Sequence, residues 1–529
     1  MDLLVQDDAV YRKSRRDPTS SYQTRNNQLV ASLYEKKSID LREKLNLVIN
    51  NAVSPKLYGL PKVHKDGTPM RPVVAFIGSP TYALAKYVAT LLSPLSNSPY
   101  NVKDSMELSR DINGKKLPEG FILASLDVIS LFTNIPVRFA LEEVERRFHE
   151  IEGHTKIEKK DFMRMLDLCL TTGYFSYNDE IYLQLDGVAM GSPISPIIAD
   201  VVMQRLLDMT LGMSSLRICC VRKYVDDLLV AVHRDDVDAM LDLVNSFHDN
   251  LKFTLELEVE GKLAYLDMWL HRNEDNTLCT SWYSKPCASN RILNFNSGHA
   301  MNMILNVGRN LVRRIRMLTT KQGVDVDAQI SRILQLNDFP LSVIRKLLMT
   351  QRPRDAEVDV VDAPFRSLGY IKGVSEKIKK RVTGSADVRL SLVPVERVRK
   401  FFTHLKDKVP LGLRSNVVYE IPCSGCTKKY VGTTKQFLRA RLGQHQRDSR
   451  NAADKRETSA LCQHVAETGH SFAFDDARVL DSHRIYSKRM FLEMLHIKNG
   501  FRQNVNRRMD IAHLSAVYAG LMTFDAGGG

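Results

Sequence analysis

The sequence feature that most constrains the fold is a pair of adjacent aspartates placed beside apolar, β-prone runs. Asp226 and Asp227 are followed directly by the run Leu228–Val232. Apolar runs separated by a short polar step predict a tight hairpin, whose strands are buried while its turn carries the carboxylates. An isolated double aspartate is more often an ordinary acidic turn. Here the apolar run Phe121–Leu126 also ends on a carboxylate, Asp127, and this second acidic residue favours a shared site.

Carboxylates that gather at neighbouring strand ends have a specific chemical use. Nucleotidyl transfer employs two divalent cations about 3.5–4 Å apart, one activating the attacking hydroxyl and one holding a triphosphate. Mg²⁺ prefers hard oxygen ligands and usually takes one or two carboxylates together with substrate phosphates. We therefore expect Asp127 and Asp226, with Asp227 at the edge of the cluster, to bind Mg²⁺ or Mn²⁺.

The order of motifs around these aspartates resembles that of reverse transcriptases. Asp127 is followed five residues later by Phe132, and then come Gly191–Pro196 and Tyr224–Asp227, which resemble motifs A, B and C. The resemblance implies a right-hand polymerase with fingers, palm and thumb that copies RNA into DNA. It also implies that the three aspartates are the metal ligands.

Two further segments make the resemblance narrower. Leu57–Lys65 resembles the fingers motif of Penelope-like retroelements, and Leu126–Pro136 resembles their motif A. The match runs from about residue 56 to residue 270, and it is specific because several motifs follow one another in the family order.

The same resemblance implies which residues would bind the substrate. Phe132 matches the steric gate that crowds a ribose 2′ hydroxyl and favours deoxynucleotides, with plain core packing as the alternative. Arg71 matches the fingers arginine that would hold the incoming triphosphate, a task suited to a permanent charge and bidentate hydrogen bonding. Lys62 and Lys65 are nearby candidates or simply solvated lysines. The segment Gly191-Ser192-Pro193 would pack beneath the nascent base pair.

A second group of motifs begins near residue 414, where new strand signals predict a separate small α/β domain. Val417–Ile421 is followed by Tyr430-Val431-Gly432, and Arg441 and His445 then share one helical face because they are four residues apart. With a glutamate and an asparagine further along, the order resembles the GIY-YIG nuclease domain over about 100 residues.

This second resemblance implies a catalytic set for phosphodiester hydrolysis. Glu493 would hold one divalent metal, and Arg441 would neutralise charge on the phosphate in the transition state. The two tyrosines and the histidine would position or deprotonate the attacking water. Asn504 competes with Asn506 for the last position. The implied residues are Tyr419, Tyr430, Arg441, His445, Glu493 and Asn506.

Cys423 and Cys426 lie between the two tyrosine motifs as a Cys-x2-Cys pair. Thiolates bind zinc at about 2.3 Å, and a structural zinc site needs four ligands. His464 and His470 would complete a Cys2His2 set, which Penelope-like endonucleases show. The competing ligands are Cys462 and His445.

These signals predict an α+β chain of several domains. The expected order is an N-terminal helical extension (1–55), fingers and palm (56–300), thumb and linker (301–410), a small α/β GIY-YIG nuclease domain (411–515) and a tail (516–529). Within this order we expect helix at 26–51, strands and turns rather than long helices at 56–99, arginine-rich helices at 300–350 and a polar linker at 352–363.

Composition agrees with an anionic partner but does not prove one. The 529-residue chain carries a formal net charge of +14, which favours nucleic acid, with a solvated lysine-rich surface as the alternative. Eight cysteines without a dense spacing pattern fit a reducing compartment. The sequence has no apolar run of about 18 residues and no basic-then-apolar N-terminal segment, so we expect neither a membrane span nor a secretory signal.

Together the resemblances imply target-primed reverse transcription. The nuclease would nick DNA, and the polymerase would extend the exposed 3′ hydroxyl with dNTPs while copying the element's RNA. The expected partners are therefore an RNA template, a DNA primer and target DNA, with nuclear localisation and a cytoplasmic phase during translation. The alternatives are a telomerase-related or intron-type reverse transcriptase, against which the nuclease motifs argue, and an inactive nucleic-acid-binding relic. The N-terminal part is short for the family, and we expect an upstream RNA-binding region to be missing.

Overall fold

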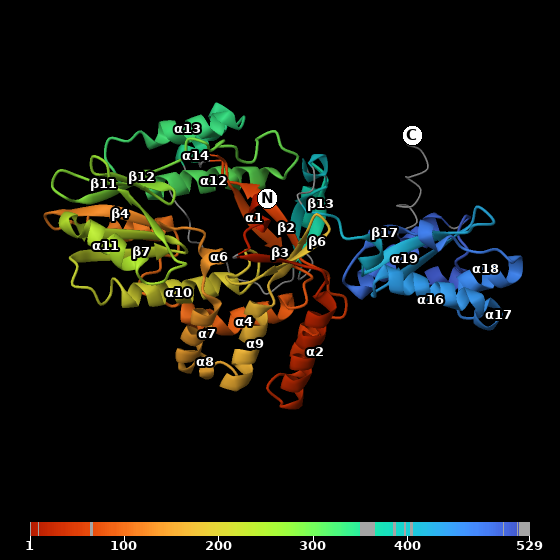
Figure 1. The fold of residues 1–529 in the computed structure, drawn as a ribbon. Helices are drawn as coiled ribbons and strands as arrows, with labels where there is room; N and C mark the ends of the chain where they lie inside the picture. The colour runs from red at the N-terminus through yellow and green to blue at the C-terminus, as the bar shows by residue number, and fades with distance from the viewer. Residues whose placement is uncertain are drawn as a thin grey trace. The chain divides into compact units, whose positions relative to one another are not determined.

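A four-stranded antiparallel sheet organises the first large part of the computed structural model (Figure 1), with strand order β7-β8-β4-β9. Its strands are β4 (Phe121–Val128), β7 (Ile218–Tyr224), β8 (Asp227–His233) and β9 (Phe253–Leu257). The second strand, β8, is buried over Leu228–Val232, as its continuous apolar run predicts for a strand covered on both faces.

The structure describes residues 2–8, 10–63, 67–349, 365–383, 388–395, 398–402, 406–500, 502–515 and 517. The fold is mixed α/β. The chain divides into two units. The first comprises Met1–Ser14, Leu57–Ala75 and Leu84–Leu405, and the second comprises Arg15–Lys56, Phe76–Ala83 and Lys406–Gly529. None of the described helices combines the length and the apolar character that crossing a lipid bilayer requires.

Both faces of the four-stranded sheet are covered because successive side chains point to opposite sides. Leu123, Leu229 and Ala231 share one core with a three-stranded sheet and with α5 (Ser105–Ile112). That sheet has the order β10-β11-β12, with β10 at Lys262–Tyr265, β11 at Met268–Arg272 and β12 at Leu278–Trp282. Figure 1 shows α10 (Ser195–Met209) and α11 (Val237–Asn245) on the other side.

A helical layer continues from α10. The helix α7 contacts both α10 and α9. These helices and their short neighbours are α6 (Leu131–Asn134), α7 (Val137–Arg146), α8 (His149–Glu152) and α9 (Lys159–Thr171). The alternation of strands and helices expected between Phe121 and Leu270 is therefore confirmed.

A second sheet of five strands has the order β1-β6-β5-β2-β3. Its strands are β1 (Tyr11–Ser14), β2 (Lys56–Pro61), β3 (Met70–Ala75), β5 (Tyr174–Tyr177) and β6 (Glu180–Gln184). The expectation of strands and turns without long helices between 56 and 99 is wrong at α4 (Tyr82–Leu92). Its buried residues Leu84, Val88 and Leu92 recur at helical spacing, and this periodicity outweighs the neighbouring Gly and Pro.

The N-terminal segment is mostly helical, with α1 (Asp2–Val5), α2 (Thr19–Glu35) and α3 (Leu41–Leu47), but it also supplies the edge strand β1. Asp40 begins α3 in a capping box with Glu43. The helix expected at 26–51 is thus two helices, which pack together where the Asn26 side-chain amide donates to the Leu47 carbonyl (3.0 Å).

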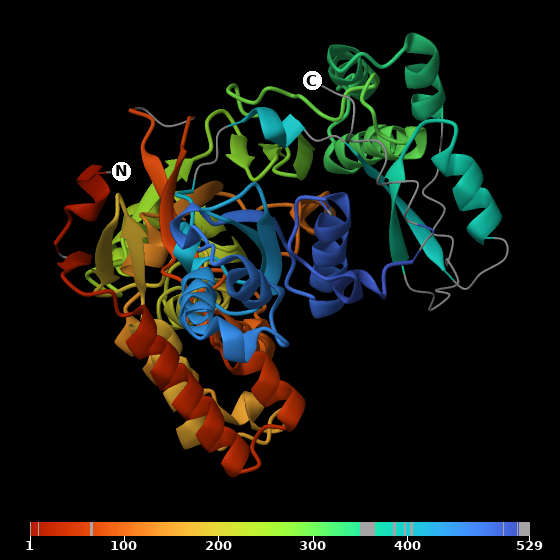
Figure 2. The ribbon, with the colours of Figure 1, turned by 90° about the vertical axis from the view of Figure 1, so that its right-hand side faces the viewer.

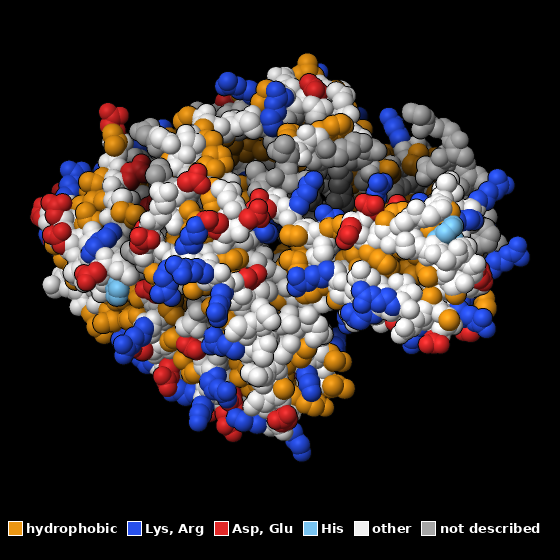
Figure 3. Space-filling view, turned by 45° about the vertical axis from the view of Figure 1, so that its right-hand side comes forward, with side chains coloured by type: hydrophobic (Ala, Val, Ile, Leu, Met, Phe, Trp, Pro, Cys, Tyr) orange, Lys and Arg blue, Asp and Glu red, His pale blue; other side chains and the backbone are white. Residues whose placement is uncertain are grey.

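Three helices follow β12 and share one apolar core: α12 (Met301–Leu318), α13 (Val326–Leu336) and α14 (Leu341–Met349). Next come two parallel strands, β13 (Phe365–Tyr370) and β14 (Arg389–Pro394), joined through α15 (Ser375–Thr383) and visible side by side in Figure 2. The expected polar linker at 352–363 lies outside the described residues. Figure 3 shows Lys and Arg side chains spread among acidic ones over the face in view.

The C-terminal part of the second unit is a small α/β fold around the sheet β16-β15-β17. The strands are β15 (Val417–Pro422), β16 (Lys429–Thr434) and β17 (Arg478–Ser482). The helices are α16 (Leu438–Arg450), α17 (Ala452–Lys455), α18 (Ala460–Thr468) and α19 (Tyr486–Asn499). Short 3-10 helices lie at Ser93–Ser96, Arg234–Asp236, Val398–Phe401, Leu411–Leu413, Phe474–Asp476 and Arg508–Ile511. Of the expected tail, the structure describes only Val517.

Candidate active sites

The two adjacent aspartates lie at a hairpin turn, as the sequence predicts. Tyr224 pairs with Asp227, so Val225 and Asp226 form a two-residue turn between β7 and β8. Val225 has a φ of +57°. A β-branched residue rarely adopts this left-handed conformation, which costs of order 1–3 kcal/mol and persists only where the surrounding structure enforces it. The turn is therefore held in a strained shape next to its carboxylates.

Asp127 lies beside this turn although about 100 residues separate it from the hairpin in sequence. Leu126 of β4 pairs with Leu228 of β8, so the next register position brings Asp127 next to Asp227. Burial raises the pKa of Asp226, and the nearby Asp127 carboxylate raises it further. Three carboxylates thus share one half-buried site, where a divalent cation would relieve their repulsion. The residues fit the expected metal.

Two basic side chains, one on the five-stranded sheet and one just beyond the end of a strand of that sheet, act on Asp226. Arg71 of β3 and Lys62, just beyond β2, both lower the pKa of Asp226 through their charge. Arg71 is exposed and Lys62 is half-buried. This positive charge opposite the acidic cluster suits a triphosphate. Lys65 lies outside the described residues.

The Gly191-Ser192-Pro193 segment contacts the strand that carries Arg71. Val74 of β3 donates its backbone N–H to the Met190 carbonyl (2.7 Å). Gly191 has a φ of +121°, and a Cβ added there would overlap the Val74 carbonyl oxygen. Ser192 is buried, and its hydroxyl makes no hydrogen bond to any described residue. The segment is thus packed against β3, and the Ser192 hydroxyl is left available for a further hydrogen bond.

Phe132 lies on the short helix α6, five residues past Asp127, and its side chain is half-buried. Its carbonyl accepts a hydrogen bond from Val188 N–H (2.7 Å), which ties it to the chain leading into Gly191. Half-burial leaves part of the ring surface available to a ligand.

Replacing Gly191 by alanine should lower primer extension by roughly 10- to 100-fold, because the added methyl displaces the segment and a shift of about 1 Å can cost that much in rate. Single-nucleotide incorporation on a primed RNA template measures the effect. Gly153→Ala is the matched control, since nothing lies within 4 Å of a Cβ at Gly153. Unchanged incorporation by Gly191→Ala would show that the close approach to β3 has no catalytic importance.

Two residues near the catalytic turn were not predicted from the sequence. The Tyr265 hydroxyl donates to the carbonyl of Asp227 (2.8 Å), so the β10–β11 hairpin supports the turn directly. Lys223, one residue before Tyr224, is completely buried and pairs with Asp200 of α10. The sequence does not predict these two contacts, because the partners come from other segments.

A second cluster of polar side chains lies on the small C-terminal sheet. The buried Tyr419 of β15 pairs with Gly432 of β16, where an added Cβ would lie 2.8 Å from the Tyr419 hydroxyl. The Tyr419 hydroxyl and His445 Nε2 of α16 are 2.7 Å apart. The ring of Tyr430 lies 5.2 Å from that of His445, centroid to centroid. Glycine at 432 therefore leaves room for both tyrosine rings around the histidine.

Burial controls the protonation of this cluster. It lowers the pKa of His445 to about 3, with help from the Arg441 charge, and raises that of Tyr419 to about 12. At neutral pH His445 is neutral, and its Nε2 shares a hydrogen bond with the Tyr419 hydroxyl. Arg441 also interacts with the Tyr419 oxygen. The structure therefore brings Tyr419, Tyr430, Arg441 and His445 together, as the motif order predicts.

Glu493 of α19 completes the cluster. Burial, assisted by the Asp510 carboxylate, raises its pKa to about 7, although the charges of Arg441 and Arg489 act in the opposite direction. A half-buried carboxylate beside a second acid and an arginine can bind a divalent cation once it is ionised. Asp510 was not predicted, and its only sequence signal is its position four residues after Asn506.

The two competing asparagines have different places. Asn506 accepts from the Val431 N–H and donates to the Val431 carbonyl, both at 2.9 Å, so it pairs with the backbone of β16. Asn504 is buried and donates to carbonyls at the end of α19. Asn506 thus positions the strand that carries Tyr430, and Asn504 closes the end of a helix.

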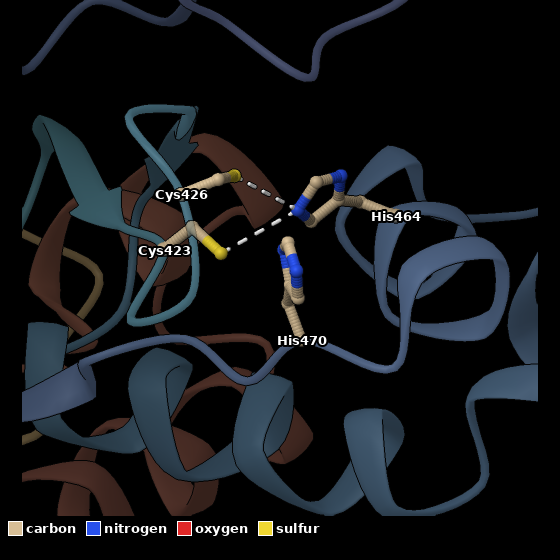
Figure 4. Close-up of side chains that lie close together, drawn as sticks. All are labelled: Cys423, Cys426, His464 and His470. Carbon is tan, nitrogen blue, oxygen red and sulfur yellow. Dashed lines mark hydrogen bonds between the residues drawn. The ribbon is translucent and has the colours of Figure 1, made fainter.

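Cys423, Cys426, His464 and His470 converge in the same fold, with thiols and imidazoles pointing toward one another in Figure 4. Their ligand atoms all lie within 4.8 Å of one another, and His464 Nε2 lies 3.4 and 3.6 Å from the two sulfurs. Bonds of 2.0–2.3 Å to one tetrahedral ion would separate ligands by about 3.5 Å. The geometry fits zinc.

The two competing zinc ligands take other positions. Cys462 is not among the side chains whose ligand atoms converge, and His445 is hydrogen-bonded to Tyr419. Gly425 also matters, since an added Cβ there would lie 2.7 Å from the His470 ring. The tertiary fold thus selects the expected Cys2His2 set.

Comparisons with known proteins agree with the first site. Residues 63–259 match the family described as reverse transcriptase (RNA-dependent DNA polymerase), and residues 291–348 match the animal helix-turn-helix domain, which covers α12 to α14. The helix-turn-helix match was not predicted from the sequence. No curated protein matches the chain.

Among solved structures, the chain is similar to telomerase from Candida albicans in complex with a fragment of telomeric RNA, at 12% identity and a TM-score of 0.36, covering 61% of this chain and 67% of that one. For apo telomerase from Candida tropicalis the identity is 11% and the TM-score 0.36, covering 64% of this chain and 65% of that one. For the RNA-dependent RNA polymerase of BmCPV the identity is 8% and the TM-score 0.35, covering 60% of this chain and 31% of that one. The chain thus spans about two thirds of these telomerases and about a third of the viral polymerase. Residues 63–259 therefore form a reverse transcriptase domain, the domain of RNA-directed DNA polymerases.

Proposed function

We propose that this chain is a Penelope-like retroelement reverse transcriptase whose C-terminal domain is a GIY-YIG-type endonuclease, acting in target-primed reverse transcription. The observation that carries the proposal is the convergence of Tyr419, Arg441, His445 and Glu493 in a chain that also contains a reverse transcriptase domain. One site would make the primer end and the other would extend it.

In the polymerase site, Asp127, Asp226 and Asp227 would hold Mg²⁺ or Mn²⁺, which activates the primer 3′ hydroxyl and neutralises triphosphate charge. Arg71 and Lys62 would bind the triphosphate, since both already act on Asp226 electrostatically.

Two other elements would set the position and type of the nucleotide. Phe132 would exclude a ribose 2′ hydroxyl. The Gly191-Ser192-Pro193 segment would support the nascent base pair, with the Ser192 hydroxyl available for a hydrogen bond.

In the nuclease site, neutral His445 would accept a hydrogen bond from the Tyr419 hydroxyl, and the Tyr419 oxygen would in turn accept a hydrogen bond from the attacking water. Arg441 would neutralise the phosphate in the transition state, and Glu493 would hold one divalent cation. Tyr430 closes the site beside the histidine.

The zinc site would be structural. Cys423 follows β15, and His464 belongs to α18, so one ion bound there would join the strand to the helix. The partners of the whole chain would be an RNA template, a DNA primer, target DNA and dNTPs, with nuclear localisation following from the activity.

The pH dependence of nicking should follow Glu493. Because its folded pKa is raised to about 7, protonation competes with metal binding up to that pH. At sub-saturating Mg²⁺ we expect nicking to rise about tenfold per pH unit below pH ~7 and to level off above it. Asp510→Asn removes a charge that raises this pKa, so the acid limb should move to lower pH. A profile that is the same in Asp510→Asn and wild type would exclude Glu493 as the titrating group.

A coupled assay tests the proposed function as a whole. Supercoiled plasmid, an RNA template and labelled dNTPs are incubated with the full chain and Mg²⁺, and nicking and label joined to plasmid are measured separately. Wild type should do both. Glu493→Ala should lose nicking and regain label incorporation on pre-nicked plasmid, whereas Asp226→Ala should nick without incorporating. Label joined to intact plasmid by Glu493→Ala would contradict the coupling.

A further inference from the structure

A lysine is buried where the catalytic turn begins. Lys223 is the last residue of β7 before Tyr224, and its side chain is 0% exposed, while the other residues of β7 are all at least partly exposed. Lysine is almost never fully buried unless its charge is paired. Its burial therefore points to a built interaction, not to a solvated charge.

The partner of the Lys223 charge lies on α10, the helix that follows the Gly191-Ser192-Pro193 segment. The Lys223 ammonium contacts the carboxylate of Asp200 on α10, whose side chain is 15% exposed. Asn101 donates to the same carboxylate (3.3 Å) and to the carbonyl of Ser96 (2.9 Å). Since α10 begins at Ser195, the ion pair links the chain just after Gly191–Pro193 to the chain just before Asp226.

The backbone of Lys223 is held by the same neighbouring segment. Its N–H donates to the Tyr100 carbonyl (2.7 Å), and its carbonyl accepts from the Val102 N–H (2.9 Å). As β7 is an edge strand of its sheet, these bonds occupy the side that β8 does not. Three segments thus meet at one residue, three positions before Asp226.

The turn itself has little packing on that side. A cavity of about 500 Å³ is lined by Tyr224 and Val225 of the turn and by Asn101, Asp200 and Lys223. Tyr224 and Val225 are about 40% exposed, at 38% and 42%. The strained φ of Val225 must nevertheless be enforced. The Lys223–Asp200 ion pair lies in the wall of this same cavity.

We infer that Lys223 and Asp200, with Asn101 as their hydrogen-bonding partner, are positioning residues for the polymerase. They set the position of the Asp226 carboxylate relative to α10 and to the Gly191-Ser192-Pro193 segment. None of the three touches the reacting atoms. The inference rests on the polymerase activity and is independent of the nuclease.

Buried ion pairs allow stability and positioning to be separated. Removing one partner leaves an uncompensated buried charge and destabilises the fold, whereas replacing both by apolar residues of similar volume is often neutral for stability. A double replacement would therefore keep the fold but lose the fixed, hydrogen-bonded geometry that places the turn.

The test compares wild type, Lys223→Met, Lys223→Met/Asp200→Leu and a matched control, Arg222→Met/Asp111→Leu. Arg222 precedes Lys223 in β7, and its pair with Asp111 is 27% and 30% exposed. The single variant should lower the melting temperature by roughly 6–12 °C. The double variant should melt within about 3 °C of wild type. Its kcat should nevertheless fall at least about tenfold, and its half-saturating Mg²⁺ concentration should rise about fivefold. The control should change neither.

A second measurement does not depend on turnover. Mn²⁺ binding to the full chain with dideoxy-terminated primer, template and dNTP, followed by electron paramagnetic resonance, should be about fivefold weaker in the double variant. A double variant with wild-type kcat, Mg²⁺ dependence and Mn²⁺ affinity would reduce the pair to a packing role and overturn the inference. If wild type incorporated no more nucleotide than Asp226→Ala, the polymerase function would fail instead, and the Mn²⁺ measurement would still decide the positioning role.

Discussion

Asp226→Ala should reduce nucleotide incorporation on poly(rA)/oligo(dT) with Mg²⁺ on the order of 1,000-fold or more, equivalent to about 4 kcal/mol of transition-state stabilisation. The reason is the geometry of the turn: Asp226 is half-buried, shares its site with Asp127 and faces the charges of Arg71 and Lys62. Without its carboxylate the remaining ligands cannot hold two cations in place.

The matched control for this experiment is Asp235→Ala. Asp235 follows β8, and its side chain is 75% exposed in a surface pair with Arg217. An exposed pair of this kind contributes little, so the control should fold and incorporate nucleotide as wild type does. Equal incorporation by Asp226→Ala and wild type would remove the polymerase assignment, whatever the nuclease does.

Replacing Cys423 and Cys426 together by serine should abolish zinc binding, unfold the C-terminal domain and eliminate nicking. Structural zinc contributes about 10–16 kcal/mol of apparent binding free energy in small domains, which exceeds the stability of most folds of this size. In our proposal the small core around β15 and α18 would depend on that ion, because Cys423 follows β15 and His464 belongs to α18. We expect one zinc per wild-type chain and none in the variant, measured by atomic emission.

Cys219→Ser/Cys287→Ser is the control, since both of these cysteines are exposed. It should keep zinc content, nicking and polymerisation. The Cys423/Cys426 variant should still extend a primer on RNA, because its polymerase residues lie in the other unit. Retention of zinc at wild-type stoichiometry would exclude the proposed ligands, and retention of nicking after zinc loss would exclude the structural role of the metal.

Local patterns were sufficient for the residues that carry chemistry. The apolar runs around Asp226 and Asp227 predicted a hairpin with buried strands. The strands β7 and β8 form the hairpin, but only β8 is buried over a continuous apolar run, whereas β7 is an edge strand that is mostly part-exposed. The Cys-x2-Cys spacing and the two later histidines likewise named the four residues that converge. Such signals are short in range, so they can be read without knowing the packing.

Long-range pairing was not accessible in the same way. The register of β4 against β8 brings Asp127 to the turn, and the packing of α10 against β7 buries Lys223 with Asp200. The same limit applies to α4, whose helical periodicity lies just after Gly and Pro residues that predicted turns. The choice among chemically equivalent residues also depends on the fold: the structure brings Cys423 and Cys426 together with the two histidines, and Cys462 is not part of that group.

The sequence by itself determined which side chains could do chemistry, because residue type and local spacing fix the ligands, the hairpin and the helical faces. Only the tertiary structure decided which of these side chains meet and how far burial shifts the pKa values of Glu493 and His445. It also decided that Lys223, which no sequence motif marked, is buried in an ion pair with Asp200. Proximity and desolvation arise from packing between distant segments, and no local pattern encodes that packing.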